Sequence, residues 1–400
     1  MKRLRTGDQN LVKQINKSIV FNTIKKKGPL SRAQVSKKTG LNKATVSTMV
    51  SELINEAFIH EIGAGKSSGG RKPVMLYFNH RAGYAVGIDV GVNYILGVLT
   101  DLSGNVIEKT ASPLRNIDID YVVGQIFSCI ETLVNNVPNS PYGIVGVGIG
   151  VPGQVGQDDQ ILFAPNLKWR NIHLKQMVEK KFLIPAKIGN EANAGAYGEQ
   201  LYGAGKNISN LVYVSIGIGI GTGIFINNRL YKGATGISGE MGHFTIDFNG
   251  KKCSCGNRGC WELYASESAL LQEASQQKLL NENDESNLDF LFREAQKGNS
   301  QVLKLLNILG ENIGFGLINI MNTFNPETII IGNRIARFKN WIKKPIERIL
   351  EERLPVYHQS NTDIRFSMLG DDSTALGAAS FAISSFFLNR KITDRLESIS

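Results

Sequence analysis

The chain has 400 residues, a net charge of +10, 42% hydrophobic residues and 20% charged residues. This composition is typical of globular proteins and excludes a largely disordered chain, and the length corresponds to two or three domains. No apolar run approaches the ~18 residues that a membrane helix needs, and no signal-peptide core follows the basic start. We therefore expect a cytoplasmic protein without a membrane partner.

The positive charge is unevenly distributed. Residues 1–80 contain 15 Lys and Arg against 4 Asp and Glu, whereas the rest of the chain contains 30 and 31. A basic module joined to a neutral body is the expected electrostatic pattern of a nucleic-acid-binding protein. The alternative that charge alone leaves open is a solvated basic arm.

Three helices are predicted in the basic module. Apolar residues recur at four-residue spacing from position 11 to 24, and this first helix ends before Gly28-Pro29. Ser31 and Gln34 form a capping box for a second, short helix that Gly40 ends. Asn42 caps a third helix. Two short helices joined by a tight turn predict a helix-turn-helix.

The third helix is expected to read DNA, because it begins with short polar and cationic side chains that fit base edges and phosphates in the major groove. Strands are predicted at 58–62 and 74–78, and Arg71 and Lys72 in the Gly- and Ser-rich tip between them could enter the minor groove. Residues 1–80 are therefore predicted to be a winged helix-turn-helix DNA-binding domain, with a protein-docking module as the alternative. The other candidate DNA contacts are Ser31, Arg32, Asn42, Lys43, Ala44, Thr45, Ser47 and Thr48.

Strands and helices alternate after Gly83. β-rich runs at 84–90 and 94–100 precede a strand near 106, a helix at 121–135 and a strand at 144–149. A comparable hairpin recurs at 211–216 and 222–226, followed by helices and by strands at 328–331 and 364–368. Residues 81–400 are therefore predicted to form an α/β domain of two related lobes, about 82–190 and 191–390, with a ligand cleft between them.

A metal site is predicted from His243, Cys253, Cys255 and Cys260. Three thiolates and one imidazole complete a tetrahedral zinc site with no open position, which is the composition of a structural site. The alternative is a set of buried cysteines without metal. Cys129 lies apart from the others and is expected to be a buried small side chain.

Carboxylates and amides flank this metal loop. Glu240 precedes His243 by three residues, Glu262 follows Cys260 by two, and the segment Asn190-Glu-Ala-Asn193 begins a helix predicted to face the same cleft. Such groups can accept from and donate to several hydroxyls at once, as sugar recognition requires. For any single Glu the alternative is a solvated surface charge.

Three motifs resemble the signature of the ROK family of sugar kinases and repressors: Gly-Glu240-Met-Gly-His243, Cys253-Ser-Cys-Gly-Asn-Arg-Gly-Cys260-Trp-Glu262 and Asn190-Glu-Ala-Asn-Ala-Gly-Ala-Tyr-Gly-Glu199. The front end, with Gly40-Leu-Asn-Lys-Ala-Thr-Val-Ser47 and Ser-Ser-Gly-Gly-Arg71-Lys-Pro, is similar to the repressor branch and most of all to its xylose-responsive members. The resemblance runs through nearly the whole chain.

The resemblance implies an actin/ribonuclease-H-like two-lobed fold of the sugar-kinase type, with zinc on the four residues above. It also implies a sugar, D-xylose, as the inducer. The implied sugar-binding residues are Gly153, Asn166, Asn190, Glu191, Glu240, His243 and Glu262.

The sequence departs from the kinases of this family at several places. Glu191 stands where they have the catalytic Asp, and the extra methylene moves the carboxylate by roughly 1 Å, a misplacement that can cost ~100-fold in rate. Asp89-Val-Gly-Val-Asn93 lacks the second Gly and the Thr of their first phosphate loop. Ile218, Thr222 and Asn333 replace Thr, Gly and Gly, so branched side chains would crowd a triphosphate.

We therefore predict a sequence-specific transcriptional repressor rather than an enzyme. A homodimer would place two recognition helices on a palindromic operator, and sugar in the cleft would release it. The alternative is an ATP-dependent ROK sugar kinase with an accessory DNA-binding domain.

Overall fold

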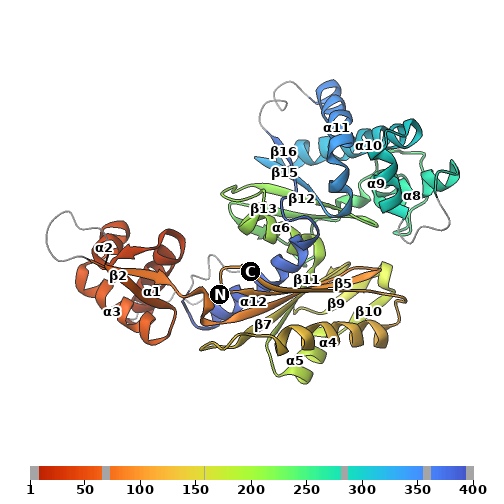
Figure 1. Ribbon diagram of the computed structural model, residues 1–400. Helices are drawn as coiled ribbons and strands as arrows, with labels where there is room; N and C mark the ends of the chain where they lie inside the picture. The colour runs from red at the N-terminus through yellow and green to blue at the C-terminus, as the bar shows by residue number, and fades with distance from the viewer. Residues whose placement is uncertain (1–8, 65–72, 157, 281–286, 355–361, 393–400) are drawn as a thin grey trace.

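The computed structural model describes residues 9–64, 73–156, 158–280, 287–354 and 362–392. Arg71 and Lys72, the two predicted minor-groove contacts, lie outside the described residues. Figure 1 shows a small N-terminal unit set to one side of a larger body that has two α/β lobes. Within the described residues, no helix is both long and apolar enough to cross a membrane.

The N-terminal unit contains three helices, α1 (Gln9–Lys27), α2 (Arg32–Thr39) and α3 (Lys43–Asn55). Its small antiparallel sheet has the order β1-β3-β2, with β1 (Leu30–Ser31), β2 (Ile59–Ala64) and β3 (Val74–Phe78). The predicted caps are present: Ser31 and Gln34 form a reciprocal capping box, and Asn42 accepts from the backbone N–H of Thr45. Gly40 ends α2 with a φ of 73°, a conformation that favours glycine.

The first lobe is built on a five-stranded sheet of order β11-β7-β4-β5-β6. The strands are β4 (Tyr84–Val90), β5 (Tyr94–Asp101), β6 (Val106–Pro113), β7 (Ile144–Val151) and β11 (Ala186–Asn190). Helices α4 (Ile119–Asn135) and α5 (Leu174–Phe182) pack on it. A second, small sheet is formed by β8 (Gln154–Val155), β9 (Ile161–Ala164) and β10 (Trp169–Ile172).

The second lobe repeats this plan in the order β14-β13-β12-β15-β16. Its strands are β12 (Leu211–Ile216), β13 (Ile220–Ile226), β14 (Arg229–Tyr231), β15 (Thr328–Gly332) and β16 (Asp363–Phe366). In both lobes a central strand begins an antiparallel meander on one side and pairs with parallel strands on the other. The predicted pair of related α/β lobes is therefore observed.

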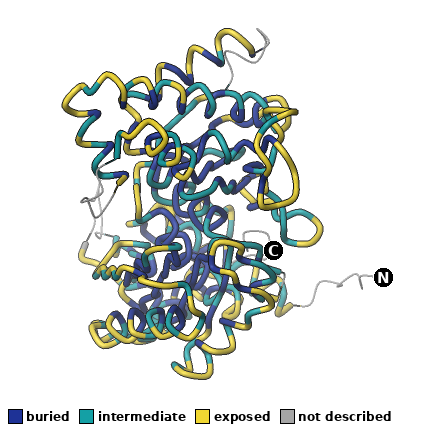
Figure 2. The backbone as a smooth tube through the Cα atoms, turned by 90° about the vertical axis from the view of Figure 1, so that its right-hand side faces the viewer, coloured by how far each residue is buried: buried dark blue, intermediate teal, exposed yellow. Residues whose placement is uncertain are grey.

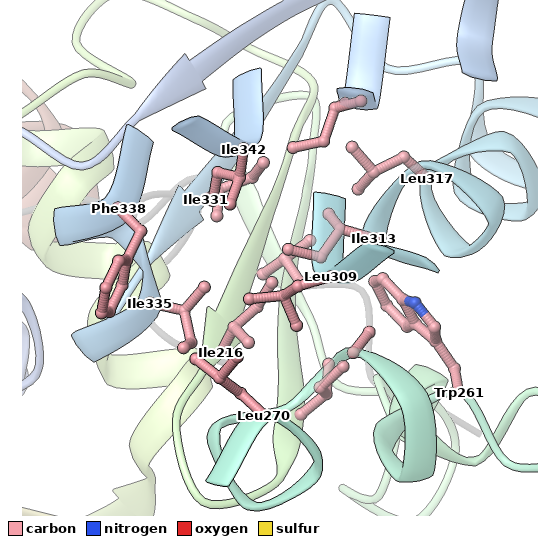
Figure 3. Packing of buried hydrophobic residues seen from close by; sticks show 14 of the residues in the cluster. Ile216, Trp261, Leu270, Leu309, Ile313, Leu317, Ile331, Ile335, Phe338 and Ile342 are labelled. Carbon is pink, nitrogen blue, oxygen red and sulfur yellow. The ribbon is translucent and has the colours of Figure 1, made fainter. Parts of the chain in front are cut away.

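The largest hydrophobic core lies in the second lobe, between its sheet and helices α7 (Glu262–Ala265), α8 (Glu267–Gln276), α9 (Asn287–Gln296), α10 (Ser300–Phe324) and α11 (Lys339–Arg353). Figure 3 shows Leu309 and Ile313 of α10 packed between Trp261 and strand residues such as Ile331. Figure 2 shows buried segments in the middle of the body and exposed segments around it.

Two helices join the lobes. Helix α6 (Glu191–Tyr202) packs on the second sheet, and the C-terminal helix α12 (Ser373–Asn389) packs on α6 and on β4 and β7 of the first sheet. Glycines permit this close approach, because a Cβ at Gly377 would overlap the carbonyl oxygen of Ala194. The predicted division of the lobes by chain order did not anticipate that α12 would lie against the first sheet.

The end of α12 also contacts the N-terminal unit. The ring of Phe387 lies 5.1 Å from that of Phe21 and 5.7 Å from that of Phe58, measured between centroids. Tyr142 stacks on Phe58 at 5.0 Å, and its hydroxyl donates to the backbone oxygen of Glu56 over 2.7 Å. The N-terminal unit and α12 therefore share one core.

Candidate functional site: a metal centre, a carboxylate cluster and the exposed start of α3

The four predicted metal ligands are close together. Their candidate ligand atoms all lie within 4.8 Å of one another. The Sγ atoms of Cys255 and Cys260 are 3.7 Å apart, and Cys253 Sγ is 3.7 Å from His243 Nδ1. Zn–S bonds of about 2.3 Å in a tetrahedron put neighbouring sulfurs about 3.8 Å apart, so these residues fit a zinc ion.

Local structure holds the cysteine loop in this shape. Isolated β-bridges pair Thr245 with Cys260 and Lys252 with Arg258. Trp261, which directly follows the last cysteine, is fully buried and its indole N–H donates to the backbone oxygen of Asn312 over 2.8 Å. The loop is thus anchored to helix α10, the main helix of the second lobe.

Glu240 and Glu262, the two carboxylates that flank the metal loop in the sequence, both lie close to His243. His243 Nδ1 is 3.5 Å from a carboxylate oxygen of Glu262, and its Nε2 is 3.9 Å from one of Glu240. The Nδ1 atom faces both Glu262 and Cys253 Sγ, whereas Nε2 faces Glu240. Burial raises the pKa of Glu240, although the nearby imidazole opposes the shift.

Asn190 and Gly153 meet at the start of α6. The side-chain N–H of Asn190 donates to the Gly153 backbone oxygen over 2.9 Å, and its Oδ1 accepts from the N–H groups of Ala192 and Asn193. Asn190 therefore caps α6 and fixes the loop after β7 at the same time. This double structural use was not predicted from the sequence.

Glu191 and Asn166 line a second part of the cleft, together with Pro152 and residues 217–219. Burial raises the pKa of Glu191 to about 7. The two parts of the cleft adjoin at Gly219, where an added Cβ would lie 3.0 Å from a carboxylate oxygen of Glu262. Glu191 and Asn166 thus line one cavity and Asn190 lines another, while Glu262, which contacts His243, lies beside Gly219 at the edge of the first.

Most of the predicted DNA-contacting residues are exposed at the start of α3. Asn42, Lys43, Ala44, Ser47 and Thr48 are exposed and Thr45 is half-buried. The two candidates at the start of α2 are engaged within the protein. Ser31 is buried in the capping box, and Arg32 pairs with Glu61 at 2.7 Å.

Comparison with known proteins identifies the family to which this architecture belongs. A model of the ROK family matches residues 85–385. The chain belongs to the ROK family. The resemblance of its motifs to that family is thereby confirmed.

Several ROK relatives match almost the full chain. "Xylose repressor" of Bacillus subtilis (strain 168) is 46% identical over 381 residues, covering 95% of this chain and 98% of its own. "Xylose repressor" of Caldicellulosiruptor bescii is 41% identical over 389 residues, covering 94% and 98%.

Solved ROK structures have the same α/β fold. A ROK family transcriptional regulator, a homologue of the E. coli MLC protein, is 29% identical with a TM-score of 0.80, covering 95% of this chain and 99% of its own. A ROK glucokinase from Streptomyces griseus, solved with glucose and AMPPNP, is 27% identical with a TM-score of 0.67, covering 74% and 98%.

The loops that depart from ROK kinases surround very little space in this protein. Gly91, Asn93, residues 217–219 and Asn333 line the same cavity as Glu191 and Asn166, and its volume is about 40 Å³. The ring of Tyr94 lies over Gly91, and its hydroxyl donates to Asp89 over 2.8 Å. Arg334 beside this cavity pairs with Glu267 at 2.8 Å. Sequence reasoning missed Tyr94, because an aromatic residue early in a strand gives no sign that its ring turns back over the preceding loop.

Proposed function

We propose that this ROK protein is a transcriptional repressor that binds operator DNA through residues 1–80 and releases it when a sugar occupies the cleft of residues 81–400. The observation that carries this proposal is the exposed, polar start of α3 on a basic N-terminal unit. The full-length match to relatives named xylose repressors supports it. We propose the cytoplasm as the location.

The N-terminal unit would act as a winged helix-turn-helix. Its order of three helices followed by a two-stranded hairpin suits an α3 that enters the major groove and a hairpin that reaches the neighbouring minor groove. Asn42, Lys43, Ala44, Thr45, Ser47 and Thr48 would contact bases and phosphates. A homodimer would present two such helices to a palindromic site.

The cleft would hold the sugar inducer, for which we propose D-xylose on the strength of the named relatives. Glu191, Glu240 and Glu262 would accept hydrogen bonds from sugar hydroxyls, and the Nε2 side of His243 would complete the set. Asn166 and Gly153 would border the sugar, and Asn190 would orient the Gly153 loop and offer its remaining amide hydrogen.

His243, Cys253, Cys255 and Cys260 would hold a structural zinc ion. When bound, zinc would crosslink the loop without an open coordination position. The protein's own contribution would be to hold Glu262 and the second nitrogen of His243 where a sugar can reach them. Loss of the metal should therefore weaken sugar binding as well as the fold.

We infer that the protein is not an enzyme. The Tyr94 ring occupies the space beside the first phosphate loop, and its hydroxyl donates to Asp89 over 2.8 Å. Ile218 and Asn333 stand where the kinases of the family have Thr and Gly. Glu191, with its pKa near neutrality, could act as a base, but nothing beside it would hold a nucleotide.

The test is to assay both activities on one preparation. An electrophoretic mobility assay with DNA from upstream of the protein's own gene should show a discrete complex that D-xylose dissociates. A coupled assay with ATP and a set of aldoses should show no turnover above background. ATP-dependent phosphorylation of an aldose without DNA binding would overturn the proposal in favour of the kinase alternative.

A further inference from the structure

A large cavity lies beside the proposed sugar site and is not used by it. Its volume is about 950 Å³, and it is lined by β11, by the turn between β8 and β9, by the β13–β14 hairpin with the loop after it, and by α12. Of the residues proposed to bind sugar, Asn190 is the one that also lines this cavity. The cavity therefore touches both lobes and the helix that carries the N-terminal unit.

The lining of the cavity is positively charged. Lys187, Arg229 and Lys232 face a single carboxylate, that of Asp159. Asp159 is buried and already has two partners, because its Oδ2 lies 3.0 Å from the Lys187 ammonium and 3.3 Å from that of Lys175. Among the described residues, Arg229 and Lys232 have no ion pair.

The nearby negative charge only partly balances the ammonium of Lys232. Burial lowers the pKa of its ammonium, an effect that Asp159 offsets in part and that the charge of Lys187 reinforces. Holding a cation away from water without a full partner is unfavourable. An anion in the cavity would remove that penalty.

Neutral polar and apolar groups complete the lining. Asn193 is 6% exposed, and its buried Oδ1 has no hydrogen-bond partner within the described structure. Asn193 is also one of the residues that line the cavity, so it adds a polar side chain to the wall. Ser385 and Asn389 of α12 offer further polar groups, and Phe381 and Leu388 of the same helix provide an apolar wall.

We propose that this cavity is a second effector site that takes a small hydroxylated organic anion, a phosphorylated or carboxylated sugar derivative. The charge accounts for the anion, and the polar side chains of Asn193, Ser385 and Asn389 account for the hydroxyls. The volume is that of a small-molecule pocket. Because a ligand here would contact both lobes and α12, its binding would be coupled to their arrangement. The assignment does not depend on which sugar is the inducer.

Isothermal titration calorimetry on the full chain tests the proposal at fixed pH and salt. The probes are D-ribose 5-phosphate for the phosphate source and D-xylonate for the carboxylate source. At least one should bind with a stoichiometry of one per chain. Binding of one probe alone identifies the anionic group that the site accepts.

Variants then locate the site. Lys232→Gln and Arg229→Gln should each weaken probe binding about tenfold or more, since each removes a charge-assisted contact. Lys232→Arg keeps the positive charge and should retain most of the affinity of the unmodified chain. Lys304→Gln, the same charge change on the exposed face of α10, should have no effect. Arg229 is exposed, so its variant keeps the test valid if replacing Lys232 disturbs folding.

The proposal is overturned if neither probe binds at millimolar concentration to folded protein. It is equally overturned if Lys232→Gln and Arg229→Gln bind the probe as tightly as the unmodified chain. Neither result depends on operator DNA or on the sugar response, so failure here would leave the repressor proposal standing.

Discussion

His243 connects two sites of different chemistry. Its Nδ1 lies 3.7 Å from Cys253 Sγ and 3.5 Å from a carboxylate oxygen of Glu262, and its Nε2 lies 3.9 Å from one of Glu240. A single ring therefore contacts both the metal loop and the carboxylate cluster. A metal on Nδ1 would fix the ring orientation and with it the position of the second nitrogen. Zinc in this loop would thus help to keep the sugar site rigid.

Replacing Cys260 tests the metal centre. Cys260→Ser should reduce bound zinc from one per chain to almost none, measured by elemental analysis, and should lower the thermal midpoint, because structural zinc stabilises the fold that holds it. Cys129→Ser, which removes the isolated buried cysteine, should keep the zinc. The assignment would be contradicted if the unmodified protein, purified without bound zinc, had the same thermal midpoint as the protein with zinc.

Glu191 gives a prediction for pH dependence. Burial raises its pKa to about 7 from 4.5, so between these values the folded protein keeps a proton that the unfolded chain loses. This carboxyl therefore destabilises the fold increasingly as pH rises through that window. Glu191→Gln should match the wild type below pH ~4.5 and be more stable above pH ~7, by up to about 3 kcal/mol.

The measurement is urea unfolding of both proteins from pH 4 to pH 8. Subtracting one stability curve from the other removes the contributions of all groups that titrate alike in both proteins. The remaining pH dependence is that of Glu191. Parallel stability profiles across the whole range would show that Glu191 titrates normally and that its site is wet.

At the scale of elements, we expect operator binding to depend most on α3. Lys43 stands in its first turn and is exposed, so it is available to a phosphate. Lys43→Gln should weaken operator binding and reduce the slope of log affinity against log salt by about 1, because one fewer counterion is released. Lys304→Gln is the matched control, and equal slopes for the two variants would exclude a phosphate contact at Lys43.

Local signals explain which elements could be predicted. The capping box at Ser31, the cap at Asn42 and the His-Cys spacing act over a few residues, and the structure has them all. The repeated strand pattern predicted two related lobes for the same reason.

Long-range packing explains what could not be predicted. Helix α12 is apolar over most of its surface, so its pattern does not say that one face would meet β4 and β7 and its end the N-terminal unit. The burial of Ser31 and the ion pair of Arg32 likewise depend on contacts with distant strands.

At the scale of the whole molecule, α12 contacts both helix α6 beside the cleft and the N-terminal unit. Helix α12 packs on α6, which begins at Glu191 and is capped by Asn190. Phe387 near the end of α12 lies against the aromatic side chains of the N-terminal unit. A sugar that changes the relation of the lobes would move α12, provided that it binds the two arrangements with different affinity.

Phe387 tests this path. Phe387→Leu keeps an apolar side chain but removes the ring contacts with Phe21 and Phe58. D-xylose binding, measured by calorimetry, should stay within about twofold, while the sugar-induced change in operator affinity should fall about tenfold, a loss of about 1.4 kcal/mol of coupling. An unchanged sugar response would exclude α12 as the connection.

The central claim is that sugar binding and DNA binding are thermodynamically linked. The most direct test is fluorescence anisotropy of a labelled upstream DNA at fixed salt, titrated with the full chain in the absence and presence of saturating D-xylose. We predict tight, saturable binding that the sugar weakens by at least a hundredfold, or about 2.7 kcal/mol, and that sugar removal restores. Identical binding curves with and without any aldose would contradict the account, because the cleft would then not control the DNA-binding unit.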